Sequence, residues 1–192
     1  MERMFWVDLE MSGLDEKVHR ILEVAVVITD LDFNELETYH TIVYQDPEVL
    51  KAMDEWCTKT HGKSGLTAAV ATGKQESLVE EELVALVGRH YGEKDRVVLC
   101  GNSVGNDKRF LDVYMPKLAK RLHYRIVDVS SFKEIFKSKW QVEFKKSDKH
   151  RALEDAQASI AEIKTYLALV TPPVKKSDST PDTAHGAGDP RG

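Results

Sequence analysis

The chain has 192 residues, of which 42% are hydrophobic and 31% charged, a composition typical of one soluble globular domain with a sizeable core. No apolar run approaches the ~20 residues of a membrane-spanning helix and no signal-peptide pattern stands at the start, so we expect a cytoplasmic protein without membrane association. Cys57 and Cys100, the two cysteines, are too few for a four-ligand zinc site.

The net charge of −5 disfavours binding to long nucleic acid, because neutralisation of phosphates dominates such affinity. The charge is unevenly distributed, since residues 107–151 contain 13 lysines and arginines against 6 acidic residues. An acidic chain with one basic segment fits a small phosphate-bearing ligand better than a long duplex. A solvated basic face explains the segment, taken alone, equally well.

Three strands in an antiparallel meander are predicted for the N-terminal part of the chain. Apolar and β-branched runs, separated by short turns, indicate strands at 4–10, 20–28 and 36–44. Connections this short favour antiparallel pairing. The run at 20–28 is typical of a central strand covered on both faces. Its one acidic residue, Glu23, fits either a hydrogen bond near a metal site or a purely structural role.

Helices alternate with two further strands in the rest of the chain. In chain order, we expect a helix at 48–59, a loop at 62–65, a helix at 75–91 and a strand at 96–101. A helix carrying Asp107 follows, continued past Pro116 by a second helix, and then a strand at 125–129, a short helix capped by Ser130 or Ser131, and a last helix at 151–169. The two later strands are joined through helices, which implies parallel pairing with a right-handed crossover. The predicted fold class is therefore α/β, a mixed five-stranded sheet of three antiparallel and then two parallel strands, with helices on both faces.

The C-terminal residues 171–192 are rich in Pro, Ser, Asp and Gly, and apolar residues are scarce among them. Such a segment cannot bury enough apolar surface to offset the entropy of ordering. We therefore predict one folded domain at 1–170 and a disordered tail at 171–192.

Two acidic residues, Asp8 and Glu10, stand two positions apart at the end of the first predicted strand. Residues i and i+2 of a strand point to the same face, and neighbouring carboxylates repel each other unless a cation lies between them. Oxygen ligands suit a hard divalent ion such as Mg²⁺. The pair therefore predicts a metal site, although an Asp-x-Glu pair on a strand is by itself common.

Asp107, His150 and Asp155 extend this pattern into later segments. Asp107 begins the helix after the fourth strand, where ligand sites form in open α/β sheets, and where an aspartate is also a common helix cap. His150 and Asp155 are five apart, or roughly 140° on a regular helix, so His150 is expected before the last helix, as a general base near neutral pH. Two ions ~4 Å apart, bridged by Asp8, would stabilise the attacking and leaving oxygens of phosphodiester cleavage. Glu10 and Asp155 would complete one ion site and Asp107 would hold the other.

Several blocks of this sequence resemble the DEDDh exonuclease superfamily. Its three motifs are matched by DLEMSGLD at 8–15, GNSVGND at 101–107 and HRALED at 150–155. Flanking blocks are similar to the oligoribonuclease family in particular: FWV at 5–7, WC at 56–57, HGKSGL at 61–66 and HYRIVDVS at 123–130. The resemblance runs from about Phe5 to Leu169 and is specific, because separated blocks agree in order and spacing. At position 12 the family more often has Thr, and Ser12 keeps the hydroxyl.

The resemblance implies an RNase H-like fold, a homodimer, and 3′→5′ removal of 5′-mononucleotides from very short RNA, chiefly dinucleotides, with two Mg²⁺ or Mn²⁺ ions per active site. By matching motif positions, it implies that Leu14 wedges between bases and that Trp56 stacks on one of them. It also implies a cap on the substrate's 5′ phosphate made by His61, Ser103, Arg125 and Ser130. Tyr124 would reach the site of the neighbouring subunit. Such a cap would exclude longer chains.

Two other functions fit the same residues. A DNA-directed exonuclease of the superfamily, such as a proofreading exonuclease, would prefer long single-stranded DNA to dinucleotides. A non-catalytic module on this scaffold would bind short RNA without cutting it, and the presence of all five catalytic residue types argues against it.

Overall fold

The computed structural model describes residues 2–145 and 151–170 and contains a five-stranded sheet in the order β3-β2-β1-β4-β5. The strands are β1 (Met4–Met11), β2 (Ile21–Thr29), β3 (Glu35–Ile42), β4 (Val97–Gly101) and β5 (Leu122–Asp128). β1, β2 and β3 pair antiparallel, whereas β4 is parallel to both β1 and β5. The predicted mixed sheet, with three antiparallel and then two parallel strands, is confirmed.

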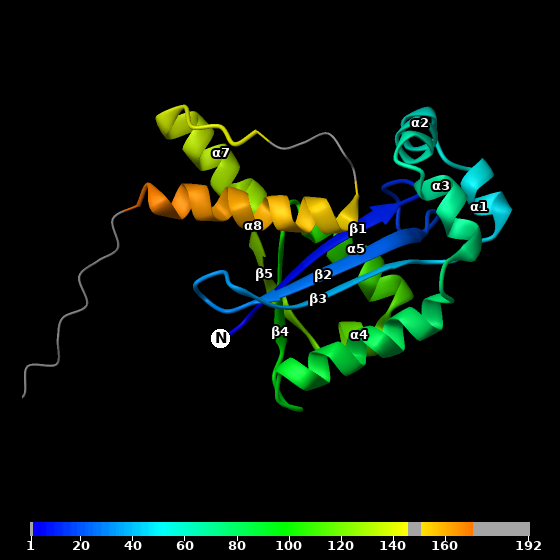
Figure 1. Cartoon of the computed structure of the whole chain (residues 1–192), viewed down its shortest axis with the longest axis horizontal. Coiled ribbons are helices and arrows are strands. Elements are labelled where there is room, and N and C mark those ends of the chain that lie inside the picture. The colour runs from blue at the N-terminus through cyan, green and yellow to red at the C-terminus, as the bar shows by residue number, and fades with distance from the viewer. Residues whose placement is uncertain (1, 146–150, 171–192) are drawn as a thin grey trace, which may run out of the picture.

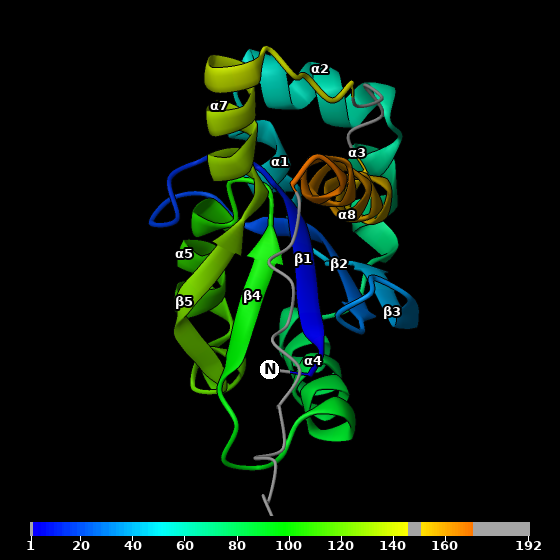
Figure 2. The same ribbon diagram turned by 90° about the vertical axis from the view of Figure 1, so that its left-hand side faces the viewer.

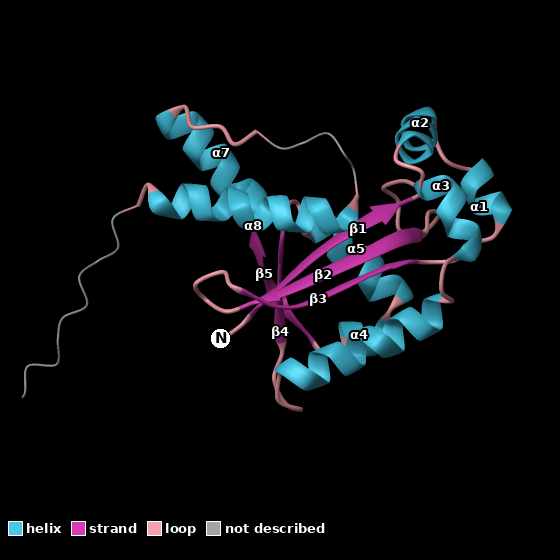
Figure 3. Cartoon of the chain, in the orientation of Figure 1, coloured by secondary structure: helices cyan, strands magenta, loops and turns pink. Residues whose placement is uncertain are grey.

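Helices cover both faces of the sheet (Figures 1 and 3). They are α1 (Pro47–Lys51), α2 (Glu55–Lys63), α3 (Leu66–Ala69), the 3-10 turn η1 (Val70–Thr72), α4 (Glu76–His90), α5 (Gly105–Tyr114), α6 (Pro116–Ala119), α7 (Val129–Trp140) and α8 (Ala152–Ala168). α7 and α8 lie on one side of the sheet and α4 on the other. Figure 2 shows β4 and β5 side by side, with β5 at the edge of the sheet.

The pleat of β1 divides the apolar core into two layers. Phe5, Val7 and Leu9 pack into the cluster that contains residues of α4 and α5, whereas Met4 and Trp6 pack into the cluster under α7 and α8. Every residue of β2 is buried, which confirms that this strand is covered on both faces. Asp8 and Glu10 continue the Met4–Trp6 alternation, so the same pleat turns them toward α8.

The region between β3 and α4 differs from the expected single helix followed by a loop. α1 ends at Lys51 and α2 begins at Glu55, where the Asp54 carboxylate accepts a hydrogen bond from the Cys57 N–H. α2 runs to Lys63, so the loop predicted at 62–65 is helical in its first half. Gly65, with φ 78°, makes the turn into α3. These short helices lie beyond the end of β1 (Figure 1) and bury their own small apolar cluster.

The start of α7 also differs from the expectation. β5 begins at Leu122, three residues before the predicted strand. The α7 cap is Asp128, whose carboxylate accepts a hydrogen bond from the Ser130 N–H, and not the hydroxyl of Ser130 or Ser131. An Asp-x-Ser sequence offers the same local turn chemistry two positions before Ser130, which explains the shift.

Cys57 and Cys100 are both free and buried. Within residues 2–145 and 151–170, no helix has the length and apolar character to cross a bilayer. The predicted disordered tail at 171–192 lies outside the described residues.

Candidate functional site

Three carboxylates gather where the end of β1 meets the first turn of α8. Asp8, Glu10 and Asp155 each contribute one oxygen, and these three oxygens lie within 4.8 Å of one another. β1 places its two residues on one face, and α8, which begins beside the end of β1 (Figure 1), adds the third. Oxygen atoms at these separations could hold a divalent cation.

The carboxyl group of Glu10 has a strongly raised pKa. Burial raises the pKa of Glu10, and the nearby carboxylates of Asp155, Glu23 and Asp107 raise it further, to about 8, against a smaller opposing effect of Arg151. Without a cation, Glu10 therefore keeps its proton at neutral pH. A bound divalent ion would favour the ionised form.

Asp107 borders this cluster from the first turn of α5. Its Oδ1 accepts a hydrogen bond from the Leu9 N–H at 2.9 Å, which ties α5 to β1 between the two acidic residues of the strand. Only 6% of its surface is exposed. Burial raises the pKa of Asp107 to about 7, with a further contribution from Asp128 and an opposing one from the Leu9 hydrogen bond.

Glu23 lies directly opposite Glu10 in the register of β1 and β2 and is fully buried. The Arg151 guanidinium donates to it at 2.6 and 3.0 Å, the Ala152 N–H donates at 3.2 Å, and His40 Nε2 lies 2.6 Å away. Burial works to raise the pKa of Glu23, but these hydrogen bonds outweigh it and hold the pKa at about 2. Glu23 is thus a satisfied structural carboxylate that ties the start of α8 to β2.

A pocket of about 430 Å³ opens beside Glu10. It is lined by Leu9, Glu10, Met11, Gly13, Leu14, Asp54, Trp56, Cys57 and His61. Leu14 is 69% exposed and Trp56 is 59% exposed. These exposed fractions are unusual, because large apolar side chains are usually buried in the core. An exposed indole next to carboxylates offers a platform on which a nucleobase could stack.

His61 lies at the base of this pocket, 1% exposed. Its Nε2 is 2.9 Å from the Met11 carbonyl oxygen. Because a carbonyl can only accept, Nε2 carries the proton in the neutral ring. Nδ1 is then an acceptor 3.9 Å from Glu10 Oε2, and it has no hydrogen-bond partner within the described part of the chain. The structure therefore places His61 with Glu10 and the apolar pocket.

Ser103 and Ser130 come together at the ends of β4 and β5. Gly101 and Asp128 are the last residues of these strands and are partners in the parallel register. A Cβ on Gly101 would approach the Val7 carbonyl oxygen to 2.6 Å, so only glycine lets β4 pass this close to β1. Asp128 Oδ1 accepts hydrogen bonds from the Ser103 N–H at 2.8 Å and the Ser130 N–H at 2.9 Å.

Tyr124 and Arg125 are neighbours on the edge strand β5. Tyr124 is 75% exposed. Arg125 Nε donates a hydrogen bond to the Tyr124 hydroxyl at 3.0 Å, and its guanidinium carbon lies 5.4 Å from the centre of that ring. Both side chains are therefore presented to solvent at the sheet edge.

His150, the predicted general base, falls in 146–150, outside the described residues. The next residue is described: Arg151, the N-cap residue of α8, is fixed by Glu23. The role of His150 stays a prediction.

Sequence reasoning missed Asp128 and the Glu23–Arg151 pair. The Asp-x-Ser pattern at 128–130 is a local turn signal that could have pointed to Asp128 as a cap. No local signal links Glu23 to Arg151, because 128 positions separate them.

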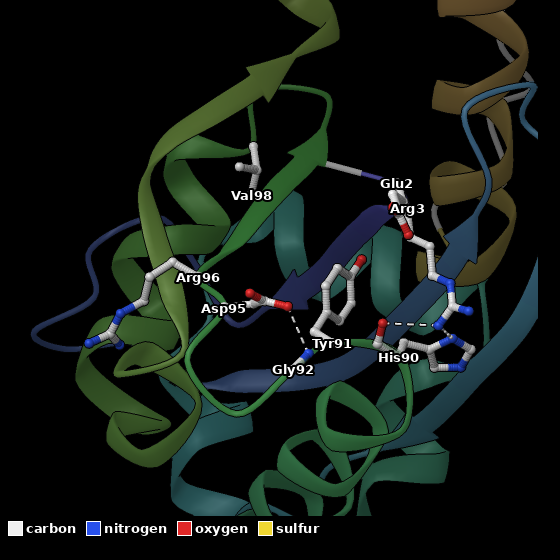
Figure 4. Close-up of a pocket in the computed structure, with 8 residues that line it drawn as sticks. All are labelled: Glu2, Arg3, His90, Tyr91, Gly92, Asp95, Arg96 and Val98. Carbon is white, nitrogen blue, oxygen red and sulfur yellow. Dashed lines mark hydrogen bonds between the residues drawn. The ribbon is translucent and has the colours of Figure 1, made fainter.

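A second cavity, of about 640 Å³, lies at the opposite ends of β1 and β4 (Figure 4). Several of its polar groups satisfy one another: Arg3 donates to the His90 carbonyl oxygen at 2.9 Å, and the Asp95 carboxylate accepts the Gly92 N–H at 2.8 Å. Arg96 points away from the other residues drawn in Figure 4. Among the residues that the structure describes, none of the predicted site residues lines this cavity.

Comparisons with known proteins agree on the family. A family model for exonucleases matches residues 5–163. The oligoribonuclease of Marinobacter nauticus is 43% identical over 171 residues, covering 86% of this chain and 94% of that protein. The mitochondrial oligoribonuclease of Homo sapiens is 45% identical over 174 residues, covering 86% of this chain and 72% of that protein.

Solved exonuclease structures share the fold. The nuclease domain of 3′hExo, a DEDDh family member, bound to rAMP, superimposes with a TM-score of 0.58 at 14% identity, covering 87% of this chain and 92% of that one. Escherichia coli exonuclease I in complex with a 5cy-dT13 oligonucleotide gives a TM-score of 0.64 at 12% identity, covering 85% and 40%. These similarities establish the RNase H-like exonuclease fold. With the sequence relatives, they show that the chain belongs to the oligoribonuclease family of 3′→5′ exoribonucleases, within the DEDDh superfamily.

Proposed function

We propose that this chain degrades very short RNA oligonucleotides, chiefly dinucleotides, to 5′-mononucleotides by metal-assisted hydrolysis from the 3′ end. One observation carries the proposal: oxygens of Asp8, Glu10 and Asp155 lie within 4.8 Å of one another beside a pocket that exposes Leu14 and Trp56. The first feature suits the chemistry of a phosphodiester, and the second suits its bases.

The acidic residues fit two divalent ions, Mg²⁺ or Mn²⁺. Asp8, Glu10 and Asp155 would hold one ion, and Asp107 together with Asp8 would hold the other. Crowded carboxylates, one of them with its pKa raised to about 8, are a donor set that a cation would stabilise. Ions bound there supply charge stabilisation for the attacking and leaving oxygens of an in-line displacement.

His150 would remove the proton from the attacking water. The water oxygen would form a bond to phosphorus, the bond from phosphorus to the 3′ oxygen would break, and that oxygen would take a proton from bulk water as it leaves. A histidine with an ordinary pKa near ~6.5 can act as such a base around neutral pH. The side chain of its neighbour Arg151 donates a hydrogen bond to Glu23, and this contact holds the start of α8, where Asp155 lies.

The substrate would lie across the pocket and the ends of β4 and β5. Leu14 would wedge between the bases and Trp56 would stack on one of them. Ser103, Arg125 and Ser130 would cap the 5′ phosphate, and His61 would join the cap from the apolar pocket, where it lies beside Glu10. The first turns of α5 and α7 begin beside the two serines, and backbone N–H groups at helix starts favour anions.

We also infer a homodimer. β5 is an edge strand that exposes Tyr124 and Ile126, and the next helix exposes Ile135. An edge strand with exposed apolar side chains is a surface that a second chain would cover. Such a partner would bring Tyr124 toward the neighbouring site. Sedimentation at micromolar concentration tests this, and a purely monomeric species would count against the role of Tyr124.

A turnover series on RNAs of two, three, five and seven nucleotides tests the proposed function. We expect kcat/KM to fall steeply with length, because a capped pocket excludes longer chains. A kcat/KM that does not change with RNA length would contradict a cap on the 5′ phosphate. A preference for long single-stranded DNA would indicate a DNA-directed exonuclease, and a dinucleotide that binds in the presence of Mg²⁺ but stays intact would indicate a non-catalytic module.

A further inference from the structure

We propose that Asp128 is a positioning residue that holds Ser103 and Ser130 in place for the 5′ phosphate of the substrate and so sets the preference for phosphorylated 5′ ends. This inference rests on the proposed function, because it assumes that the two serines contact that phosphate. It adds a residue that the motif comparison does not assign.

A single oxygen of Asp128 joins two segments that are distant in sequence. Its Oδ1 accepts the Ser103 N–H at 2.8 Å, the Ser130 N–H at 2.9 Å and the Ser130 hydroxyl at 2.7 Å. The two Ser130 bonds are those of a helix cap and would suffice to start α7. The bond to Ser103 is not needed for capping, since Ser103 belongs to the turn between β4 and α5.

Ser103 has an unusual backbone conformation. Its φ is 55°, in the left-handed region that residues other than Gly, Asn and Asp rarely adopt because the Cβ atom crowds the backbone there. The hydrogen bond to Asp128 holds the turn on one side, and Asn102 Nδ2 donates to Glu162 of α8 at 3.4 Å on the other. Glycine would adopt this φ without strain, so a serine held here points to a use for its side chain.

Asp128 acts through the serines and not on the phosphate. A carboxylate repels a phosphate group, so direct binding by Asp128 is unfavourable. In the free protein the Ser130 hydroxyl donates to Asp128. When a phosphate is bound, that hydroxyl rotates to donate to a phosphate oxygen. The Ser103 and Ser130 N–H groups keep their bonds to Asp128, so the two serines stay in register.

The test compares kcat and KM of the full chain on RNA dinucleotides with a 5′ phosphate and with a 5′ hydroxyl. In Asp128→Ala we expect the preference for the phosphorylated substrate, measured as the ratio of kcat/KM values, to fall about tenfold, mainly through KM, which is the loss of roughly one charge-assisted hydrogen bond. Asp128→Asn should lose less, because its amide oxygen still accepts. The kcat on the 5′-hydroxyl substrate should stay within about twofold in both variants.

Two controls separate positioning from other effects. Asp112→Asn changes an exposed aspartate of α5 that pairs with Lys108, and it should leave the preference unchanged. Mn²⁺ affinity, measured by calorimetry, should fall far less in Asp128→Asn than in Asp8→Asn. Asp128 raises the pKa of Asp107 but would hold no ion, so this comparison separates the cap from the acidic cluster. Ser103→Gly keeps the N–H but removes the hydroxyl and the strain, so it should lose the preference without losing thermal stability. Asp128→Asn keeps the test open if Asp128→Ala fails to fold, because its amide oxygen can still cap α7.

If both Asp128 variants are less stable but keep the preference for a 5′ phosphate, Asp128 is only a helix cap. That result would overturn this inference and leave the proposed function unaffected. If the unchanged chain cuts dinucleotides but does not prefer a 5′ phosphate, the capped pocket fails and the inference fails with it. If the unchanged chain does not cut dinucleotides, the proposed function itself fails.

Discussion

The two ends of β1 carry cavities of opposite character. Where the strand ends, Asp8, Glu10 and Asp155 place oxygens within 4.8 Å of one another beside a pocket of about 430 Å³. Where it begins, a larger cavity of about 640 Å³ contains groups that bond to each other, such as Arg3 and His90. Cavity size therefore does not mark the site. Like charges gathered together, which call for an external cation, mark it better.

The same contrast holds between two carboxylates that face each other across β1 and β2. Glu10 has a pKa raised to about 8, first by burial and then by other carboxylates, whereas hydrogen bonds from His40, Arg151 and Ala152 hold the pKa of Glu23 at about 2 against the effect of burial. Both residues have little contact with water. The difference lies in their partners, so one carboxylate is available to a ligand and the other is already used by the fold.

The largest expected effect comes from the acidic end of β1. Asp8→Asn and Asp155→Asn should each lower turnover of a 5′-phosphorylated RNA dinucleotide by about 10³-fold or more, because each removes a charged ligand of an ion that stabilises the transition state. Mononucleotide release followed by chromatography measures it. Asp95→Asn, at the other end of the sheet, is the matched control and should stay within about twofold. Comparable losses in all three would erase the contrast between the two ends.

The next effect concerns stability. Glu23→Ala leaves Arg151 without its buried partner and should lower the free energy of unfolding by about 3 kcal/mol, measured by urea denaturation. Glu37→Ala removes a more exposed carboxylate that pairs with Arg89, and it should cost about 1 kcal/mol or less. Equal losses from the two variants would show that the buried Glu23 stabilises the fold no more than the more exposed Glu37 does.

The apolar pocket should matter for substrate binding more than for chemistry. Trp56→Ala should raise KM for a dinucleotide about tenfold or more, since stacking of one base contributes roughly 1–3 kcal/mol. Leu14→Ala should act in the same direction. Leu78→Ala, which also changes an exposed leucine but on α4, should leave KM unchanged. A normal KM in both pocket variants would contradict binding of the substrate's bases in this pocket.

The last prediction is a pH dependence of stability in the absence of metal. The folded state raises the pKa of Glu10 from 4.5 to about 8 and that of Asp107 from 3.8 to about 7, so between these limits it binds more protons than the unfolded chain. The stability of the metal-free protein should therefore fall as pH rises from about 5 to about 8. Melting temperatures in EDTA and in excess Mg²⁺ measure it. Mg²⁺ should remove the decline, and a metal-independent profile would contradict a cation at these carboxylates.

Much of the fold follows from local pattern. The alternation of β1 and the apolar run of β2 predict which side chains are buried, and the i, i+2 spacing predicts that Asp8 and Glu10 share a face. Boundaries were less predictable where side chains cap helices, as Asp54 and Asp128 do. Those caps depend on which of several nearby acidic or hydroxyl side chains accepts hydrogen bonds from the backbone N–H groups.

The site was predictable in its acidic residues and not in what supports them. The structural role of Glu23 could not be decided from sequence, because its partners come from another strand and from the start of α8. The bond between Asp128 and Ser103 spans 25 positions and depends on the parallel register of β4 and β5. Leu14 and Trp56 are exposed although large apolar side chains are usually buried, and only the family resemblance indicated this exposure.

A crystal soaked in Mn²⁺ and measured at the manganese absorption edge tests the central claim most directly. We expect anomalous scattering between the carboxylates of Asp8, Glu10 and Asp155, with each contributing an oxygen at coordination distance. Well-ordered carboxylates with no manganese among them would contradict it.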